Sequence, residues 1–194
     1  MARADKVTDA TGIKKLILTL RYHEQSRQWF AVLFVPLVAL LGTSQQAALI
    51  AGSVIALVGA LIRLWASGHV KKNKVLATDG PYAYVRHPLY VGNILILLGY
   101  SIASMLWWSY VLMAFLLWFY YPPAISYEDN KLKNLFGEEW ENWSKNIHAL
   151  IPTLKHKAGS TSSEWSFKQS LMSNGEPVIF IYLVVFMYLL SQNA

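Results

Sequence analysis

The sequence contains no cysteine and carries little charge for its length. Without cysteine, a disulfide framework and a thiolate metal site are both excluded, and no metal site is predicted. Charged residues make up 14% of the 194 residues, well below the roughly 25% of a typical soluble domain. Hydrophobic residues make up 55%. This balance favours a membrane protein over a soluble globular domain.

Charge is wholly absent from three long stretches. These stretches are residues 28–62, 88–127 and 177–194. A helix needs about 20 apolar residues to cross a hydrocarbon core about 30 Å thick. The first two stretches therefore predict two spans each, split at GTSQQ (42–46) and bent at SMLWWS (104–109), and the third predicts one more. We expect an all-α integral membrane protein with about five transmembrane helices, the first beginning near Tyr22. A soluble bundle is the alternative, but its core needs no uncharged run of this length.

The basic residues lie on one side of the predicted spans. Lys and Arg occur in the N-terminal segment, in the loop 63–87 and after the second hairpin, whereas GTSQQ and SMLWWS have none. By the positive-inside rule, the N-terminus and the basic loops are cytoplasmic. The net charge of +6 then reflects topology and attraction to anionic lipid, so we expect a lipid bilayer and no nucleic acid as partner. The polar N-terminus is not typical of a signal peptide.

These patterns divide the chain into seven segments of alternating polarity. They are a polar N-terminal segment (1–21), a transmembrane hairpin (22–66), a cytoplasmic loop (67–87), a second hairpin (88–127), an amphipathic cytoplasmic helix (128–154), a polar linker (155–176) and a C-terminal transmembrane helix (177–194). Pro122 and Pro123 are expected to kink or end the fourth span, since neither donates a backbone hydrogen bond. Ser126 with Asp129 then resembles a capping box for a new helix. We expect the C-terminal helix to serve as a packing helix or lid.

The first candidate for chemistry is the stretch GPYAYVRHPLY, residues 80–90. Pro88 is tolerated in the first turn of a helix, so Arg86 and His87 are held at the helix entrance. The stretch also contains three tyrosine hydroxyls, those of Tyr82, Tyr84 and Tyr90. Free helix amides, a guanidinium and an imidazole suit an anionic group such as a carboxylate. The plainer interpretation is that Arg86 and His87 anchor the span at the membrane interface.

The second candidate is the acidic pair Glu128 and Asp129. Both fall in the first turn of the predicted amphipathic helix, where acids compensate the helix dipole. The functional interpretation is that they accept hydrogen bonds from the hydroxyls of a bound ligand. The residues alone leave both interpretations open.

These two stretches together resemble a known family. GPYAYVRHPLYVG (80–92), followed by E-D-x-x-L-x-x-x-F-G-E-E-W (128–140), is similar to the integral-membrane methyltransferases. This family includes isoprenylcysteine carboxyl methyltransferase and the phospholipid N-methyltransferases. The resemblance covers roughly residues 60–152. It implies S-adenosylmethionine as methyl donor, bound on the cytoplasmic side by the loop before span three and the helix after span four.

The resemblance also implies residue roles. The residues that it places at the cofactor are Gly80, Tyr82, His87, Tyr90, Glu128 and Asp129. Glu128 corresponds to the acid that binds the ribose. Isoprenylcysteine methyltransferases usually carry an arginine four residues before the paired acids, where it can orient a substrate carboxylate, and this sequence has Ala124 there. Arg86 is the candidate catalytic residue that would replace it.

The sequence thus predicts an S-adenosylmethionine-dependent membrane methyltransferase acting on a small apolar or lipid acceptor, through a carboxylate, thiol or amine. One alternative is an NADPH-dependent enzyme like the sterol reductases, which is disfavoured because only Lys71, Lys72 and Lys74 form a basic cluster suited to a 2′-phosphate. The other is a non-catalytic membrane protein that retains the fold, which the alanine at position 124 keeps open. Neither the acceptor nor an oligomeric state is specified by the sequence.

Overall fold

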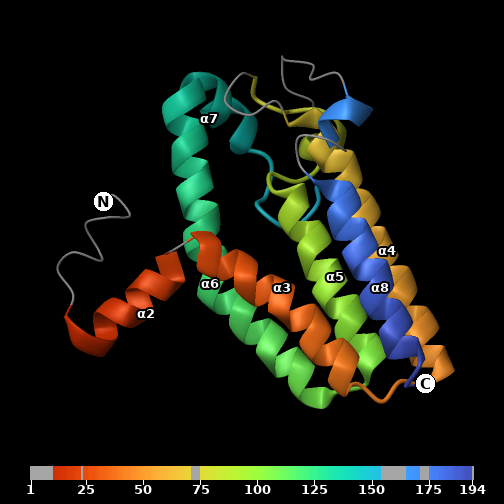
Figure 1. The fold of residues 1–194 in the computed structure, drawn as a ribbon. Coiled ribbons are helices and arrows are strands. Elements are labelled where there is room, and N and C mark those ends of the chain that lie inside the picture. The colour runs from red at the N-terminus through yellow and green to blue at the C-terminus, as the bar shows by residue number, and fades with distance from the viewer. Residues whose placement is uncertain (1–10, 23, 71–74, 154–164, 171–174, 194) are drawn as a thin grey trace.

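The computed structural model describes residues 11–22, 24–70, 75–153, 165–170 and 175–193. In these residues the chain is helical and has no β-strand (Figure 1). The elements are α2 (Gly12–Tyr22), α3 (Glu24–Leu41), α4 (Gln46–His69), the 3-10 helix η1 (Gly80–Ala83), α5 (Pro88–Ser104), α6 (Trp107–Phe136), α7 (Glu138–Ser144) and α8 (Glu176–Ser191). The cluster Lys71, Lys72 and Lys74 and most of the polar linker lie outside the described residues.

Both predicted interruptions of the long apolar stretches are present. Helix α3 ends at Leu41 and α4 begins at Gln46, while α5 ends at Ser104 and α6 begins at Trp107. The two turns lie side by side, because the backbone N–H of Thr43 donates to the Ser104 carbonyl at 3.2 Å. The uncharged turns therefore meet at one end of the bundle.

Helix α6 differs from the sequence prediction. It runs without a break through Pro122 and Pro123, so the prediction of a new helix capped at Ser126 is wrong. Figure 1 shows that the ribbon of α6 changes direction along its length, as prolines inside a helix favour. The break falls later, at Gly137, after which α7 begins. A single helix therefore carries both the apolar span and the acidic pair.

A contact from α2 explains how α6 continues through its prolines. Pro123 has no N–H, so the carbonyl four residues earlier, that of Phe119, loses its helical donor. The Nε of Arg21 donates to this carbonyl at 3.2 Å. The Arg21 guanidinium also lies 5.6 Å from the Phe119 ring centroid and 5.8 Å from that of Trp118. Helix α2 thus satisfies a backbone group that the proline leaves unpaired.

Helices α4 and α5 approach so closely that only glycine fits at their contact. A Cβ atom on Gly52 would lie 2.3 Å from the Gly99 carbonyl oxygen, and one on Gly59 would lie 2.6 Å from that of Gly92. Small residues at helix contacts are typical of membrane bundles, in which van der Waals packing replaces the hydrophobic effect. This pair fixes the start of α5, and with it Arg86 and His87.

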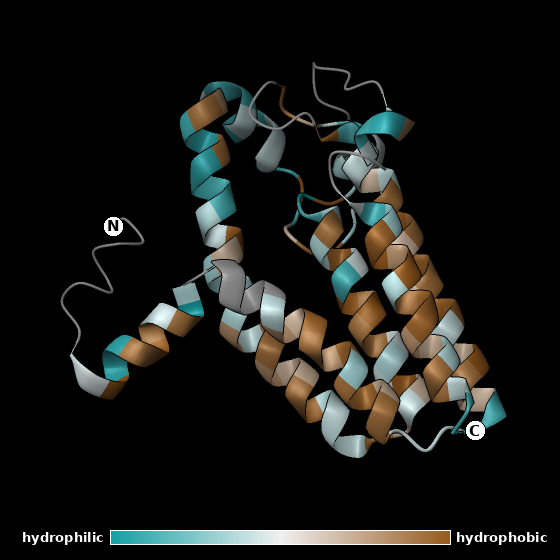
Figure 2. Cartoon of the chain, in the orientation of Figure 1, coloured by the Kyte–Doolittle hydropathy of each residue, from teal (hydrophilic) through white to brown (hydrophobic). Residues whose placement is uncertain are grey.

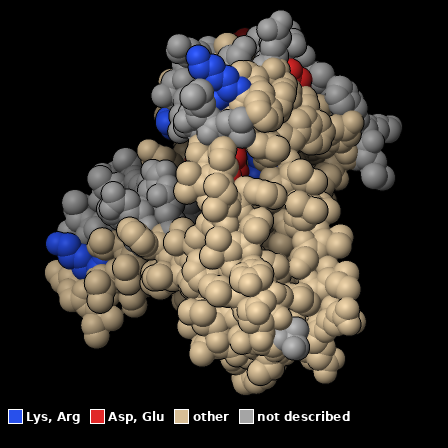
Figure 3. All heavy atoms as spheres, turned by 45° about the vertical axis from the view of Figure 1, so that its right-hand side comes forward, with Lys and Arg blue, Asp and Glu red and all other residues tan. Residues whose placement is uncertain are grey.

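The bundle surface is predominantly apolar. In the described residues α4 and α6 are long and apolar enough to cross a membrane, and three shorter apolar helices accompany them, at Trp29–Leu41, Pro88–Ser104 and Glu176–Ser191. Only 17% and 22% of the most apolar windows of α4 and α6 is buried, unlike the core helices of a soluble protein. Figure 2 shows this hydrophobic bundle below a hydrophilic α7 and upper α6, and Figure 3 shows charged side chains gathered mainly at the same end.

Helix α4 is longer than predicted. It continues to His69, so the prediction that Arg63 belongs to the cytoplasmic loop is wrong, because Arg63 lies inside the helix. Its neighbour α8 packs into the bundle through two tyrosine hydroxyls: Tyr100 donates to the Leu183 carbonyl, and Tyr182 donates to the Val32 carbonyl. Helix α8 is therefore tied to both α3 and α5.

Substitution of Gly52 tests the close contact of α4 with α5. Gly52→Val would force the helices apart, and overpacking of this kind costs roughly 1–3 kcal/mol. We expect the unfolding temperature in detergent to fall by about 5 °C. The matched variant Ala51→Val, at the neighbouring exposed position, should change it by less than about 1 °C. Equal effects of the two variants would contradict the close contact.

Candidate functional site

A large cavity opens where the polar and apolar parts of the bundle meet. Its volume is about 930 Å³, near the upper end of the usual range for ligand sites. It is lined by polar side chains of the loop before α5 and of upper α6, and by apolar side chains of α3, α5, α6 and α8. The cavity can therefore take one polar and one apolar ligand side by side.

Backbone hydrogen bonds hold the loop before α5 in place. The N–H groups of Arg86 and His87 donate to the carbonyls of His148 and Ala149 at 2.9 and 3.1 Å. Thr153 donates to the Tyr84 carbonyl at 2.8 Å. The amides of Arg86 and His87, directly before the helix, are thus paired within the chain. The same bonds connect the loop to the segment after α7, which brings the two sequence motifs together.

The two motifs meet in a cluster of four charged side chains. Asp129 accepts from both sides: its Oδ1 lies 3.0 Å from His87 Nε2, and its Oδ2 lies 3.1 Å from Arg86 Nη2. Glu128 Oε2 lies 3.3 Å from His87 Nδ1. Arg86 Nη1 also donates to the Ser144 carbonyl at 3.4 Å. Because α6 begins at Trp107, Glu128 and Asp129 do not compensate a helix N-terminus, and that interpretation is wrong.

The surroundings of His87 favour its protonated form. Its side chain is buried, which by itself would lower the pKa. The hydrogen bonds and charges of Asp129 and Glu128 outweigh this effect and raise the pKa of His87 above its ordinary value. Both ring nitrogens face a carboxylate, and the ring stacks on Tyr90 with a centroid distance of 5.4 Å. The two carboxylates therefore hold the His87 ring in place and favour its charged form.

Tyr82 and Gly80 lie on the 3-10 helix η1 beside this cluster. The Tyr82 side chain is buried and lines the cavity, and burial together with the Glu128 charge raises its pKa, so its hydroxyl stays protonated. Gly80 has a φ of +55°, and a Cβ there would lie 2.3 Å from His69 Nε2. Gly80 thus permits the turn that presents Tyr82, although Gly80 does not line the cavity.

The structure brings the predicted site residues into one place. Those that line the cavity are Tyr82, Arg86, His87, Tyr90 and Glu128. Asp129 pairs with Arg86 and His87, and Gly80 supports the turn before Tyr82. Ala124 lies on α6 one helical turn before Glu128, so both occupy one side of the helix.

Three further polar residues line the cavity and escaped the sequence analysis. They are Arg63 of α4, Asn93 of α5 and Glu176 of α8. Arg63 was counted as a loop residue and Glu176 as the end of a linker. Arg63 and Glu176 are ionisable residues beside long apolar stretches, and this signal could have identified them. Such residues are costly in a membrane bundle unless they have a function or a partner. No group of three metal-binding side chains occurs in the described residues.

Comparison with known proteins finds relatives of the stretch that carries these residues. The sequence model described as Phospholipid methyltransferase matches residues 47–139, which include both motifs up to Glu139. The chain is 37% identical over 86 residues to the protein-S-isoprenylcysteine O-methyltransferase of Schizosaccharomyces pombe, covering 43% of this chain and 36% of that protein. No solved structure matches the chain significantly.

Two further relatives carry different names. The nickel-cobalt-cadmium resistance protein NccN of Alcaligenes xylosoxydans xylosoxydans is 32% identical over 143 residues, which are 65% of this chain and 63% of NccN. The methanethiol S-methyltransferase of Crocosphaera subtropica is 33% identical over 81 residues, which are 42% of this chain and 31% of that enzyme. The chain covers less than two thirds of the length of each of these relatives. The match of residues 47–139 to this family model, together with relatives named as methyltransferases, supports the resemblance to membrane methyltransferases that the two motifs predict.

Proposed function

We propose that the protein is a membrane methyltransferase that uses S-adenosylmethionine and acts on a small apolar or lipid acceptor. The observation that carries the proposal is the single cavity in which the two family motifs meet an apolar chamber. S-adenosylmethionine supplies an activated sulfonium methyl group. The task of the protein is then to hold the acceptor in line with that methyl group and to keep water away.

The polar part of the cavity fits such a donor. Two buried N–H groups of cavity-lining residues, Arg86 Nε and Trp143 Nε1, have no hydrogen-bond partner among the described residues. Buried donors normally have an acceptor, which a ligand or a water molecule can provide. S-adenosylmethionine is rich in acceptors, with a carboxylate, ribose oxygens and ring nitrogens. Glu128, whose side chain is 46% exposed, can accept hydrogen bonds from the ribose hydroxyls.

The charged cluster has a positioning role in this proposal. Asp129 fixes Arg86 and His87, and His87 in turn holds Glu128 toward the cavity. Arg86 is already bound to Asp129 and to the Ser144 carbonyl through Nη2 and Nη1, which leaves Nε as its one unpaired nitrogen within the described part of the chain. We assign Arg86 to the donor and not to an acceptor carboxylate, which revises the role that the sequence suggested.

The topology in this proposal uses all five apolar helices as spans. The donor enters from the polar end of the bundle, where α7 and the upper part of α6 gather the hydrophilic residues (Figure 2). By the positive-inside rule, the basic segments support a cytoplasmic position for that end. The acceptor enters sideways between helices, and its apolar part stays in the bilayer. The polar donor site therefore lies at the membrane interface.

Calorimetric titration with S-adenosylhomocysteine tests the donor site. We expect micromolar binding by the wild type, and at least about 10-fold weaker binding after His87→Ala or Glu128→Ala, since each change removes a charged hydrogen-bond partner. His148→Ala and Glu138→Ala are matched controls at exposed positions and should bind like the wild type. A folded wild type that binds no S-adenosylhomocysteine would overturn the proposal, and NADPH would be the next ligand to titrate.

The raised pKa of His87 predicts a dependence of stability on pH. A group with a raised pKa in the folded state stabilises the protein below its ordinary pKa, and this stabilisation is lost as the pH rises through the folded-state value. The advantage of the wild type over His87→Gln in unfolding temperature should therefore shrink as the pH rises above the ordinary histidine pKa of about 6.5. The difference between the wild type and His148→Gln should stay constant. An advantage that grows with pH would show that His87 is held neutral.

A further inference from the structure

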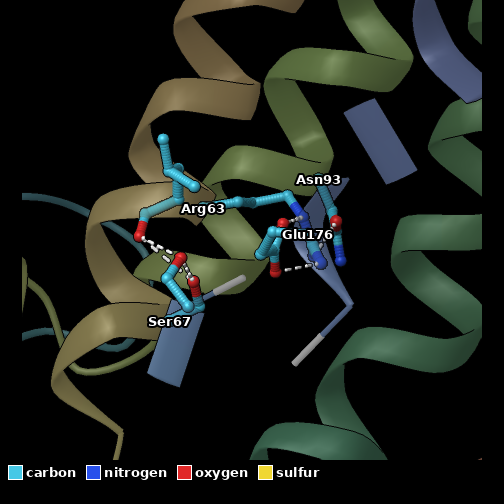
Figure 4. A network of polar contacts seen from close by, with 6 residues as sticks. Arg63, Ser67, Asn93 and Glu176 are labelled. Carbon is cyan, nitrogen blue, oxygen red and sulfur yellow. Dashed lines mark hydrogen bonds and ion pairs between the residues drawn. The ribbon is translucent and has the colours of Figure 1, made fainter. Parts of the chain in front are cut away.

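A buried ion pair lies in the wall of the cavity, outside the two family motifs. Arg63 Nη2 and Nε donate to the two carboxylate oxygens of Glu176, at 2.8 and 3.2 Å, and Arg63 Nη1 donates to Asn93 Oδ1 at 2.6 Å. Figure 4 shows the three side chains converging from α4, α5 and α8. The side chains of Arg63 and Glu176 are only 13% and 6% exposed. Each nitrogen of this guanidinium therefore has a partner within the chain.

The charges that line the cavity are largely neutralised by one another. Arg63 is paired with Glu176, and Arg86 is paired with Asp129. The remaining lysine of the lining, Lys131, is exposed on the hydrophilic part of α6. The chamber formed by α3, α5, lower α6 and α8 is otherwise apolar. An acceptor in this chamber meets no guanidinium without a carboxylate partner.

We infer that the Arg63–Glu176 pair is a charge filter that restricts the apolar chamber to acceptors uncharged at neutral pH. The inference rests on the proposed function and specifies its acceptor. An acceptor carboxylate would need a guanidinium as its partner. The guanidinium of Arg63 is already paired with the Glu176 carboxylate. Ala124 offers no replacement. A carboxylate acceptor would enter as an anion and lose its hydration without a counter-ion, which is costly in a low-dielectric site.

Of the three acceptor groups considered, the thiol satisfies this filter. At neutral pH a carboxylic acid is an anion and an amine is a cation, whereas a thiol with a pKa of about 8.5 or higher is mostly neutral. The thiol binds uncharged and releases its proton to solvent at the polar end of the cavity, outside the apolar chamber. Its sulfur then forms a bond to the methyl carbon as the bond from that carbon to the donor sulfur breaks, and the electron pair stays on the donor sulfur. The products are a methyl thioether and S-adenosylhomocysteine.

Two ligands with the same skeleton test the filter by equilibrium binding. The probes are 2-phenylethanethiol and 3-phenylpropanoate, titrated into detergent-purified wild type with and without saturating S-adenosylhomocysteine. We expect the thiol to bind at least about 10-fold more tightly than the carboxylate. A carboxylate that binds the wild type as tightly as the thiol would overturn the inference. This comparison needs no variant, so it does not depend on how a substitution folds.

The variant Glu176→Gln tests the residue directly. It keeps the shape of the side chain and leaves Arg63 without its anion, so 3-phenylpropanoate should bind at least about 10-fold more tightly and raise the unfolding temperature by about 3 °C or more. Binding of the thiol should change by less than about threefold. Glu138→Gln, an equal change of charge at an exposed position of α7, should leave both ligands unaffected. An unchanged preference in a folded Glu176→Gln would overturn the role of Glu176.

Donor binding separates this inference from the proposed function. If S-adenosylhomocysteine does not bind but the thiol still binds more tightly than the carboxylate, the donor proposal fails and the charge filter stands. If S-adenosylhomocysteine binds and the carboxylate binds as well as the thiol, the charge filter fails and the donor site stands.

Discussion

The contact of Asp129 with Arg86 and His87 is the interaction on which the cavity depends. These residues come from two elements that are far apart in the sequence, the loop before α5 and the upper part of α6. The upper part of α6 stands away from the rest of the bundle (Figure 1), and this contact connects it to α5. It acts together with the packing of Leu132 and Phe136 of α6 in the apolar cluster that contains Tyr82.

The cost of unpaired polar groups in an apolar environment explains the other polar contacts. Pro123 leaves a carbonyl without a donor, and Arg21 of α2 provides one. Arg63 lies inside a helix of the bundle, and Glu176 and Asn93 neutralise and bind it. In each case a side chain from a distant part of the chain satisfies the group, so the polar contacts also connect the helices. The same requirement therefore determines both the tertiary contacts and the charge of the cavity wall.

Much of the fold follows from local patterns in the sequence. The uncharged stretches predicted the apolar helices, and GTSQQ and SMLWWS predicted the turns between them, because both signals depend only on neighbouring residues. The two motifs predicted which residues would meet, although the pairing of Asp129 with both Arg86 and His87 could not be read from them. Helix continuity through Pro122 and Pro123 was not predictable in the same way. The Phe119 carbonyl that Pro123 leaves unpaired receives its hydrogen bond from Arg21, which lies 98 residues away in the sequence.

The sequence analysis missed the ion pair between Arg63 of α4 and Glu176 of α8 for a related reason. The charge of Arg63 was taken to mark the end of a span, since charged residues commonly lie in loops. The structure instead places Arg63 within α4. A charge there needs a buried partner, and that partner is Glu176 of α8.

This pairing gives α8 a chemical contribution to the cavity besides its packing. The family motifs determine the polar side of the cavity, where the donor is proposed to bind. Arg63 and Glu176 line the part of the cavity where the acceptor is proposed to bind, and Glu176 lies outside residues 47–139, which match the family model. Under the proposed function, donor binding and acceptor choice would therefore depend on different parts of the chain. A substitution of Glu176 in α8 would then alter the charge of this wall and leave the cluster around Asp129 intact.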